Sequence, residues 1–179
     1  MNPAANLILV GPTGAGKTCI GRHLAAHYSL RLRDADREVE RRTGVSVGTI
    51  FECEGEAGFR ARERAVLAEL LADDGVLLAT GGGAVLDADN RRLLHARGFV
   101  VHLQVSPAQQ LARLARDRTR PLLQRDDRDA VLEEMAIRRA PLYAEVADLQ
   151  FDTDGYVAAD AAARLIEQLG RHWQRGVAA

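Results

Sequence analysis

The sequence predicts an α/β fold built on a parallel β-sheet, because strand-length apolar runs alternate with helical patterns along the chain. Two of these runs, at 7–10 and 76–79, are apolar at every position, which is typical of strands buried on both faces of a sheet. A glycine-rich segment follows each run. The chain has 179 residues, of which 47% are apolar. We therefore expect one domain over 1–179 that buries a core without disulfides.

The other elements follow from apolar spacing, capping residues and turn residues. Ser106-Pro107 is a suitable N-cap and first-turn pair, and Gly98 follows a helical pattern with an acidic start and a basic end. The segment 44–58 holds several glycines and is expected to be irregular. The remaining expected strands are 30–33, 99–105 and 149–151, and the expected helices are 18–28, 57–71, 87–97, 106–116, 129–139 and 158–173.

Charge and cysteine content disfavour several classes of protein. The formal net charge is −1, which argues against a general nucleic-acid or membrane-surface binder. Cys19 and Cys53 have neither metal-ligand spacing nor a disulfide framework, which favours a reducing compartment. The longest apolar stretches have strand length, and the first residues lack the pattern of a signal peptide. We therefore expect a cytoplasmic protein with no nucleic-acid or membrane partner. Separately, we expect a monomer.

A phosphate-binding loop follows the first buried run. Residues 11–18 read Gly-Pro-Thr-Gly-Ala-Gly-Lys-Thr and match G-x-x-x-x-G-K-[ST] between a predicted strand and a predicted helix. Such a loop aims backbone N–H groups and the helix dipole at phosphate oxygens. Lys17 can reach the β- and γ-phosphates, and the Thr18 hydroxyl can ligate Mg²⁺. The setting disfavours a chance glycine turn. The expected ATP-binding residues here are Gly14, Ala15, Gly16, Lys17, Thr18 and Cys19, the last as a packed small residue.

The acid that usually helps to hold the metal must come from an unusual place. The strand at 76–79 is followed by Thr80, where such proteins commonly carry Asp. Asp34 and Asp36, after the expected strand at 30–33, are the nearest candidates. Two carboxylates two residues apart on an extended segment point the same way. One could face the metal while the other meets an acceptor; the alternative is a solvated Asp-Ala-Asp turn.

Five further motifs accompany the phosphate loop in a fixed order. They are Asp-x-Asp at 34–36, Gly-Glu-x-x-Phe-Arg-x-x-Glu at 55–63, Thr-Gly-Gly-Gly at 80–83, Arg-Pro-Leu-Leu at 120–123 and Arg-Ala-Pro-Leu-Tyr at 139–143. With them the chain resembles shikimate kinase over nearly its whole length. The resemblance implies a three-layer P-loop kinase fold with a five-stranded parallel sheet. It also implies a substrate-binding segment near 34–62 and a lid near 113–127.

The same resemblance implies the reaction and the acceptor site. The reaction is phosphoryl transfer from ATP to the 3-hydroxyl of shikimate in the chorismate pathway, with one Mg²⁺ ion. Asp36 would bind the hydroxyls and orient or deprotonate the acceptor. Arg60 and Arg139 would grip the carboxylate, which suits a planar guanidinium fork. Gly82 would bind the substrate through its backbone N–H, with Phe59, Gly81 and Gly83 beside it.

The resemblance assigns the nucleotide and metal residues as well. Asp34 would support the Mg²⁺ through water, together with Thr18. Arg120 in the lid would reach the ATP phosphates, and with Lys17 and Asp36 it completes the expected catalytic set. Arg113 would lie against adenine, and the 152–156 loop, with Tyr156, would line the same pocket. An Arg-rich lid can close over a triphosphate and exclude water, a competing acceptor.

Each motif has a simpler alternative. Arg60 and Glu63 are three apart on an expected helix and could form a surface ion pair. Residues 81–83 could be a plain turn, the arginines near 120 a solvated loop, and Arg139 a cation favoured at a helix end. A gluconate kinase would share the phosphate loop but should lack the Gly-Gly-Gly and Phe-Arg elements. A nucleoside monophosphate kinase and a regulatory nucleotide switch are further alternatives. A kinase should consume ATP much faster when its acceptor is present, whereas a switch should not.

Overall fold

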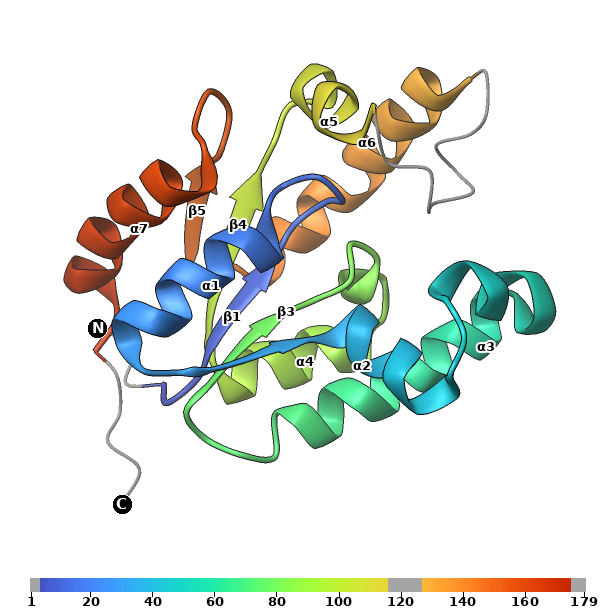
Figure 1. Ribbon diagram of the computed structural model, residues 1–179, viewed down its shortest axis with the longest axis horizontal. Helices are drawn as coiled ribbons and strands as arrows, with labels where there is room; N and C mark the ends of the chain where they lie inside the picture. The colour runs from blue at the N-terminus through green and yellow to red at the C-terminus, as the bar shows by residue number, and fades with distance from the viewer. Residues whose placement is uncertain (1–3, 116–126, 175–179) are drawn as a thin grey trace.

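The structure, a computed structural model, describes residues 4–115 and 127–174 (Figure 1). Five parallel strands form one sheet in the order β2-β3-β1-β4-β5. This order confirms the predicted five-stranded parallel sheet. The strands are β1 (Leu7–Val10), β2 (Arg31–Asp34), β3 (Val76–Ala79), β4 (Phe99–Gln104) and β5 (Leu149–Asp152).

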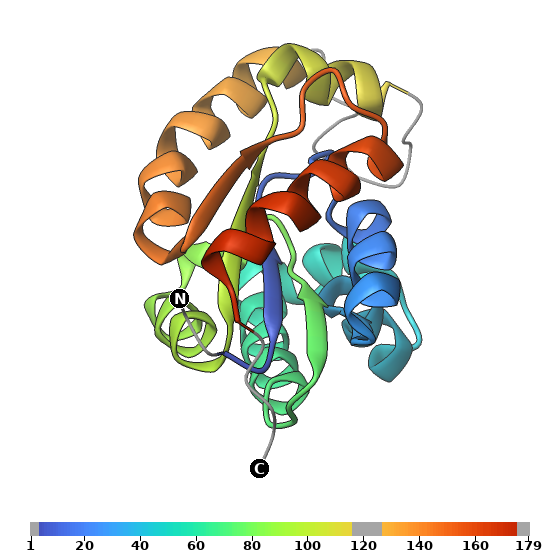
Figure 2. The same ribbon diagram turned by 90° about the vertical axis from the view of Figure 1, so that its left-hand side faces the viewer.

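Helices cover both faces of the sheet, as a parallel sheet requires. On one face α1 and α7 pack against Leu9, Leu77 and Val101, and on the other face α3, α4 and α6 pack against Ile8 and Leu78 (Figures 1 and 2). The helices are α1 (Lys17–Tyr28), α2 (Ala35–Thr43), α3 (Val47–Leu70), α4 (Ala88–Arg97), α5 (Pro107–Leu114), α6 (Arg128–Val146) and α7 (Ala158–His172), with a 3₁₀ turn η1 (Ala84–Leu86). Among the described helices, none is long and apolar enough to cross a membrane.

The expectation that 44–58 is irregular is wrong. Helix α3 begins at Val47 with Ser46 as its N-cap, and only Gly55 leaves helical geometry, at φ 70° and ψ −177°. The two halves on either side of this kink are joined by Phe51 and Phe59, whose ring centroids lie 4.7 Å apart. A small apolar cluster between α2 and α3 therefore overrides the low helix propensity of the glycines.

Helix α6 also differs from its prediction, because it runs past Arg139 to Val146 with Pro141 inside it. Proline removes one backbone hydrogen bond from a helix. Burial of Tyr143 and Val146 against the sheet offsets this cost. The extension places Arg139 and Tyr143 one turn apart on the same side of α6, which matters for the site described next.

Candidate active site

The phosphate loop lies between β1 and α1, at the carboxyl end of the central strand. Gly14 and Gly16 adopt φ values of 84° and 89°, which favour glycine and let the loop curl around an anion. The N-cap of α1 is Gly16, and no side chain of the described residues caps this helix. Its first N–H groups and its dipole therefore face the loop. Lys17 Nζ donates to the carbonyls of Gly11 and Pro12 at 2.7 and 2.8 Å.

A hydroxyl and a carboxylate meet beside this loop. Thr18 Oγ1 donates to Asp34 Oδ2 at 2.6 Å, while Asp34 Oδ1 accepts from the backbone N–H of Arg37 and caps α2. These are hard oxygen donors of the kind that Mg²⁺ prefers. The described residues contain no cluster of three or more His, Cys, Asp or Glu side chains. Such a sparse donor set fits an ion that keeps waters and takes its other ligands from nucleotide phosphates.

The expectation that Asp34 and Asp36 share one extended segment is wrong. Asp34 is the last residue of β2, and Asp36 lies in the first turn of α2. The change from strand to helix between them means that strand alternation does not set their directions. Asp34 meets Thr18, whereas Asp36 lies against the glycine turn that follows β3. The two carboxylates thus serve different parts of the site.

The glycine turn at 81–83 is closely surrounded by charged side chains. A methyl group placed on Gly81 would lie 2.7 Å from both Asp36 Oδ1 and Glu63 Oε1. One placed on Gly83 would lie 2.7 Å from Arg60 Cζ. A side chain at either position would push the end of one of these charged side chains away from the turn. The charged groups of Asp36, Glu63 and Arg60 therefore lie directly against the backbone of residues 81–83.

Gly82 lies where the glycine turn meets the phosphate loop. A methyl group on Gly82 would lie 3.2 Å from the backbone nitrogen of Thr13 and 3.6 Å from Arg139 Nη1. Arg139 Nη1 itself donates to the Gly82 carbonyl at 3.2 Å, and burial lowers the pKa of Arg139. The turn thus connects the phosphate loop to the cluster formed by Asp36, Arg60, Glu63 and Arg139.

Arg60 is held by a buried carboxylate. Its Nη1 lies 2.6 Å from Glu63 Oε2, and Glu63 is only 1% exposed. This pair is therefore no surface ion pair. Glu63 Oε1 has no hydrogen-bond partner among the described residues. Burial raises the pKa of Glu63, and the nearby charge of Arg60 opposes that rise. Phe59 lies in the α2–α3 core beneath the Arg60 guanidinium, 5.2 Å from ring centroid to Cζ.

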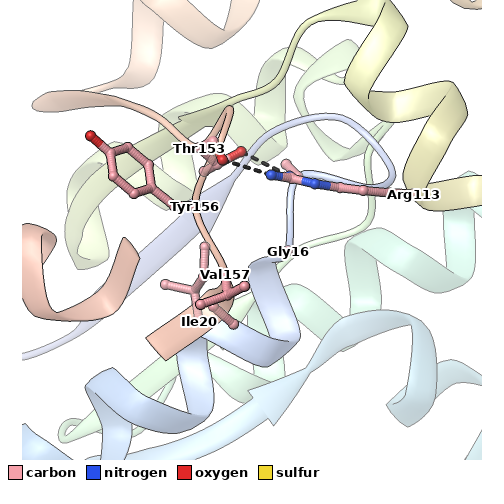
Figure 3. Close-up of a pocket in the computed structure, with 8 residues that line it drawn as sticks. Gly16, Ile20, Arg113, Thr153, Tyr156 and Val157 are labelled. Carbon is pink, nitrogen blue, oxygen red and sulfur yellow. Dashed lines mark hydrogen bonds between the residues drawn. The ribbon is translucent and has the colours of Figure 1, made fainter. Parts of the chain in front are cut away.

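A cavity of about 290 Å³ opens beside the phosphate loop (Figure 3). Ala15, Gly16 and Ile20 line one side, and Arg113 and Tyr156 are also in its wall. Arg113 Nη1 donates to the carbonyl of Gly14 and to Thr153 Oγ1, both at 3.0 Å, and its Nη2 donates to the Thr153 carbonyl. These hydrogen bonds fix the Arg113 guanidinium in the wall of a pocket that adjoins the phosphate loop. The expectation that Cys19 is a packed small residue is wrong, because Cys19, in the first turn of α1, is exposed.

Most of the predicted site residues converge on this edge of the sheet. Arg120 and most of the predicted lid lie outside the described residues, which include only 113–115 and 127 of that segment. Sequence reasoning included Thr153 only as part of the 152–156 loop and gave no individual role to Tyr143. It placed Glu63 in the 55–63 motif, with a surface ion pair to Arg60 as the alternative. The only signal for Tyr143 was its place in the 139–143 motif.

His102 on β4 is a further buried polar residue that sequence reasoning missed. It is 7% exposed, its ring stacks on Tyr143 with centroids 4.6 Å apart, and its Nδ1 has no hydrogen-bond partner among the described residues. Burial, helped by the charge of Lys17, lowers the pKa of His102 to about 4. The single polar residue in an otherwise apolar run at 99–103 could have signalled it.

This pKa predicts a loss of stability in mild acid. The unfolded chain takes up a proton at His102 near pH 6.5, whereas the folded protein resists until about pH 4. The free energy of unfolding should therefore fall as the pH drops through this window, by about 1–2 kcal/mol between pH 7 and pH 5 from this group. Urea unfolding at pH 7 and pH 5, measured for the protein and for the variant His102→Phe, tests this prediction. If the free energy of unfolding fell by the same amount in both proteins, the prediction would be contradicted.

Comparisons with known proteins agree on one family. A sequence model described as "SKI: Shikimate kinase" matches residues 13–170. A shikimate kinase of Stenotrophomonas maltophilia (strain R551-3) is 59% identical over 175 residues, which cover 98% of this chain and 97% of that protein. One of Xanthomonas oryzae pv. oryzae (strain PXO99A) is 53% identical over 174 residues, with 97% of both chains covered. The structure titled "Shikimate kinase from Acinetobacter baumannii in complex with shikimate" matches with a TM-score of 0.90 and 45% identity, covering 93% of both chains.

Proposed function

The chain belongs to the shikimate kinase family, and from this premise we propose how it transfers the γ-phosphoryl group of ATP to the 3-hydroxyl of shikimate, giving shikimate 3-phosphate and ADP. The observation that carries the proposal is the glycine turn at 81–83. This turn has Asp36, Arg60 and Arg139 around it and touches the phosphate loop at Thr13. An acceptor held there would face the terminal phosphate of a nucleotide in the loop.

The acceptor carboxylate is assigned to Arg60, Arg139 and the backbone N–H of Gly82. Two guanidinium groups offer paired donors that match a planar carboxylate. Arg60 reaches the turn with its position fixed by Glu63, and Arg139 is already bonded to the Gly82 carbonyl. Donors held in place before binding lose little conformational freedom when the substrate arrives. Phe59 supports this arrangement from the core below Arg60.

Asp36 is assigned to the reacting hydroxyl. Its Oδ1 lies on the Gly81 side of the turn, close to the buried carboxyl of Glu63. There it would accept a hydrogen bond from the 3-hydroxyl, orient the oxygen towards the γ-phosphorus, and take the proton as the new P–O bond forms. Phosphoryl transfer has a loose transition state, so orientation contributes more than base strength.

The nucleotide is assigned to the phosphate loop and the adjoining cavity. Lys17 would leave its carbonyl partners on the loop and neutralise charge on the β- and γ-phosphates, together with Arg120. Adenine would enter the cavity, between Arg113 and Tyr156 in its wall. Thr18 and Asp34 would hold Mg²⁺, with Asp34 acting through water. When bound, this ion supplies charge neutralisation on the β- and γ-oxygens.

We further propose that the protein acts as a monomer in the cytoplasm and has no nucleic-acid or membrane partner. Two features support the expected partners and the compartment. The net charge of −1 offers no overall attraction for polyanions. Cys19 and Cys53 are both free thiols, which suits a reducing compartment.

The proposal is tested by measuring ADP production from Mg-ATP with shikimate, with gluconate and with no acceptor. We expect strong stimulation by shikimate only. Gluconate also carries a carboxylate, but on an open chain, whereas the ring of shikimate fixes the direction from its carboxylate to the hydroxyl that must meet Asp36. Stimulation by gluconate instead would support a kinase activity but refute shikimate as its acceptor. Slow ADP production at the same rate with and without each acceptor would refute the kinase activity and favour a nucleotide switch.

A further inference from the structure

The carbonyl of Gly82 is held by two donors. The hydroxyl of Tyr143 donates to it at 2.6 Å, and Arg139 Nη1 donates to it at 3.2 Å. Both donors come from the same side of α6, one turn apart. Glycine has the widest choice of backbone conformations, so a glycine that must present its backbone to a ligand gains most from being restrained.

The ring of Tyr143 is itself held from the sheet side. It is 3% exposed and stacks on His102 with an interplanar angle of 21°. His102 lies opposite Val10, the last residue of β1 before the phosphate loop. The flat ring of His102 on β4, an interior strand, therefore supports the ring of Tyr143, whose hydroxyl reaches the turn at 81–83.

Packing alone gives no reason for these polar atoms. His102 buries an Nδ1 that has no hydrogen-bond partner within the described part of the chain, which costs stability relative to an apolar side chain. Burial also raises the pKa of Tyr143 to about 12, so its phenol stays protonated and can donate at any working pH. The stacked rings of His102 and Tyr143 instead fix the direction of the Gly82 carbonyl beside the proposed acceptor site.

We propose that Tyr143, supported by His102, is a positioning residue for the acceptor: it fixes Gly82 and Arg139 in the geometry that receives the substrate carboxylate. This inference rests on the proposed function, because it assigns a role through Gly82 and Arg139. Neither Tyr143 nor His102 is assigned a contact with the substrate; both act through Gly82 and Arg139. Their effect is expected on acceptor affinity and not on nucleotide affinity.

The test compares Tyr143→Phe with the unaltered protein. The variant keeps the ring and its stacking but removes the donor to Gly82. We expect the dissociation constant of shikimate, measured by calorimetry without nucleotide, to rise about 5- to 10-fold, as for loss of one buried hydrogen bond. The KM for shikimate should rise in step, while the KM for ATP stays within about twofold, since the hydrogen bond that is lost ends on Gly82 and not on a residue of the phosphate loop. An unchanged shikimate affinity would overturn the proposal, as would equal weakening of both substrates.

Two variants of His102 test the support from β4. His102→Phe keeps a flat ring and should keep shikimate affinity, whereas His102→Ala removes the stack and should weaken shikimate as Tyr143→Phe does. If both behave like the unaltered protein, His102 has no positioning role. Thermal unfolding of each variant shows whether the fold as a whole is destabilised. The affinity of each variant for ADP shows whether the nucleotide site is intact.

Arg139→Lys separates this inference from the proposed function. Lysine keeps the charge but loses the planar fork. If Arg139→Lys leaves shikimate binding unchanged, the proposed acceptor site itself is wrong. If Arg139→Lys weakens shikimate and Tyr143→Phe does not, the site stands and only the positioning role of Tyr143 fails.

Discussion

Replacing Asp36 with asparagine is expected to lower kcat with shikimate by about 10²- to 10⁴-fold, the usual effect of removing a group that handles the reacting proton. Asparagine has nearly the same shape, but its neutral amide neither accepts the proton nor balances the two arginines of the site. Asp36 Oδ1 lies against Gly81, at the turn where the acceptor is proposed to bind. Steady-state ADP production at saturating shikimate measures the loss.

Asp73→Asn provides the matched control for this variant. Asp73 lies just before β3, at the opposite end of the sheet, in an exposed ion pair with Arg31. Such pairs contribute little to stability, so this variant should keep full activity. If Asp36→Asn also kept kcat within about twofold, the assignment of Asp36 to the reacting hydroxyl would be refuted.

Replacing Lys17 with alanine is expected to lower kcat by about 10²- to 10³-fold, as for loss of one charge-stabilising donor at a transition state. The ammonium group lies against the Gly11 and Pro12 carbonyls, at the centre of the phosphate loop. Shikimate affinity without nucleotide should not change, because Lys17 belongs to the other half of the site. Steady-state kinetics and shikimate calorimetry on the same variant test both statements.

The composition of the chain offers a second test of Lys17. It is the only lysine in the sequence, so an amine-directed reagent has one side chain and the α-amino group to modify. We expect modification of the side chain to abolish activity and Mg-ATP to protect against it. Lys17→Ala is the control, since it should be modified at the α-amino group alone. Full activity after complete side-chain modification would contradict the assigned role.

Local signals were enough to predict most of the fold. The buried runs at 7–10 and 76–79 are strands, and the phosphate loop follows the first of them, because apolar runs and loop glycines act through neighbouring residues. The boundaries that failed depended on tertiary packing. Of the glycines within α3, only Gly55 leaves helical geometry, and Pro141 is tolerated because the residues after it are buried.

The acceptor site was predicted from the resemblance and not from local pattern. Nothing in the sequence around Glu63 distinguishes a surface ion pair with Arg60 from the buried pair that the structure has, because both have the same spacing on a helix. Gly81 follows β3, Asp36 lies on α2 and Arg139 lies on α6, so the three are far apart in the chain. Only the strand order, which sets β2 beside β3, brings the first two together.

The strand order also bears on how the chain folds. Every ladder joins distant segments, since Leu7 lies opposite both Leu77 and Phe99, and Val101 lies opposite Leu149. Closing such long loops costs entropy before the contacts form, and parallel sheets of this kind fold slowly. The phosphate loop, although its motif is complete within eight residues, can be held in shape only after β3 and β4 have docked on both sides of β1. Nucleotide binding during refolding should therefore appear late, together with the last of the sheet.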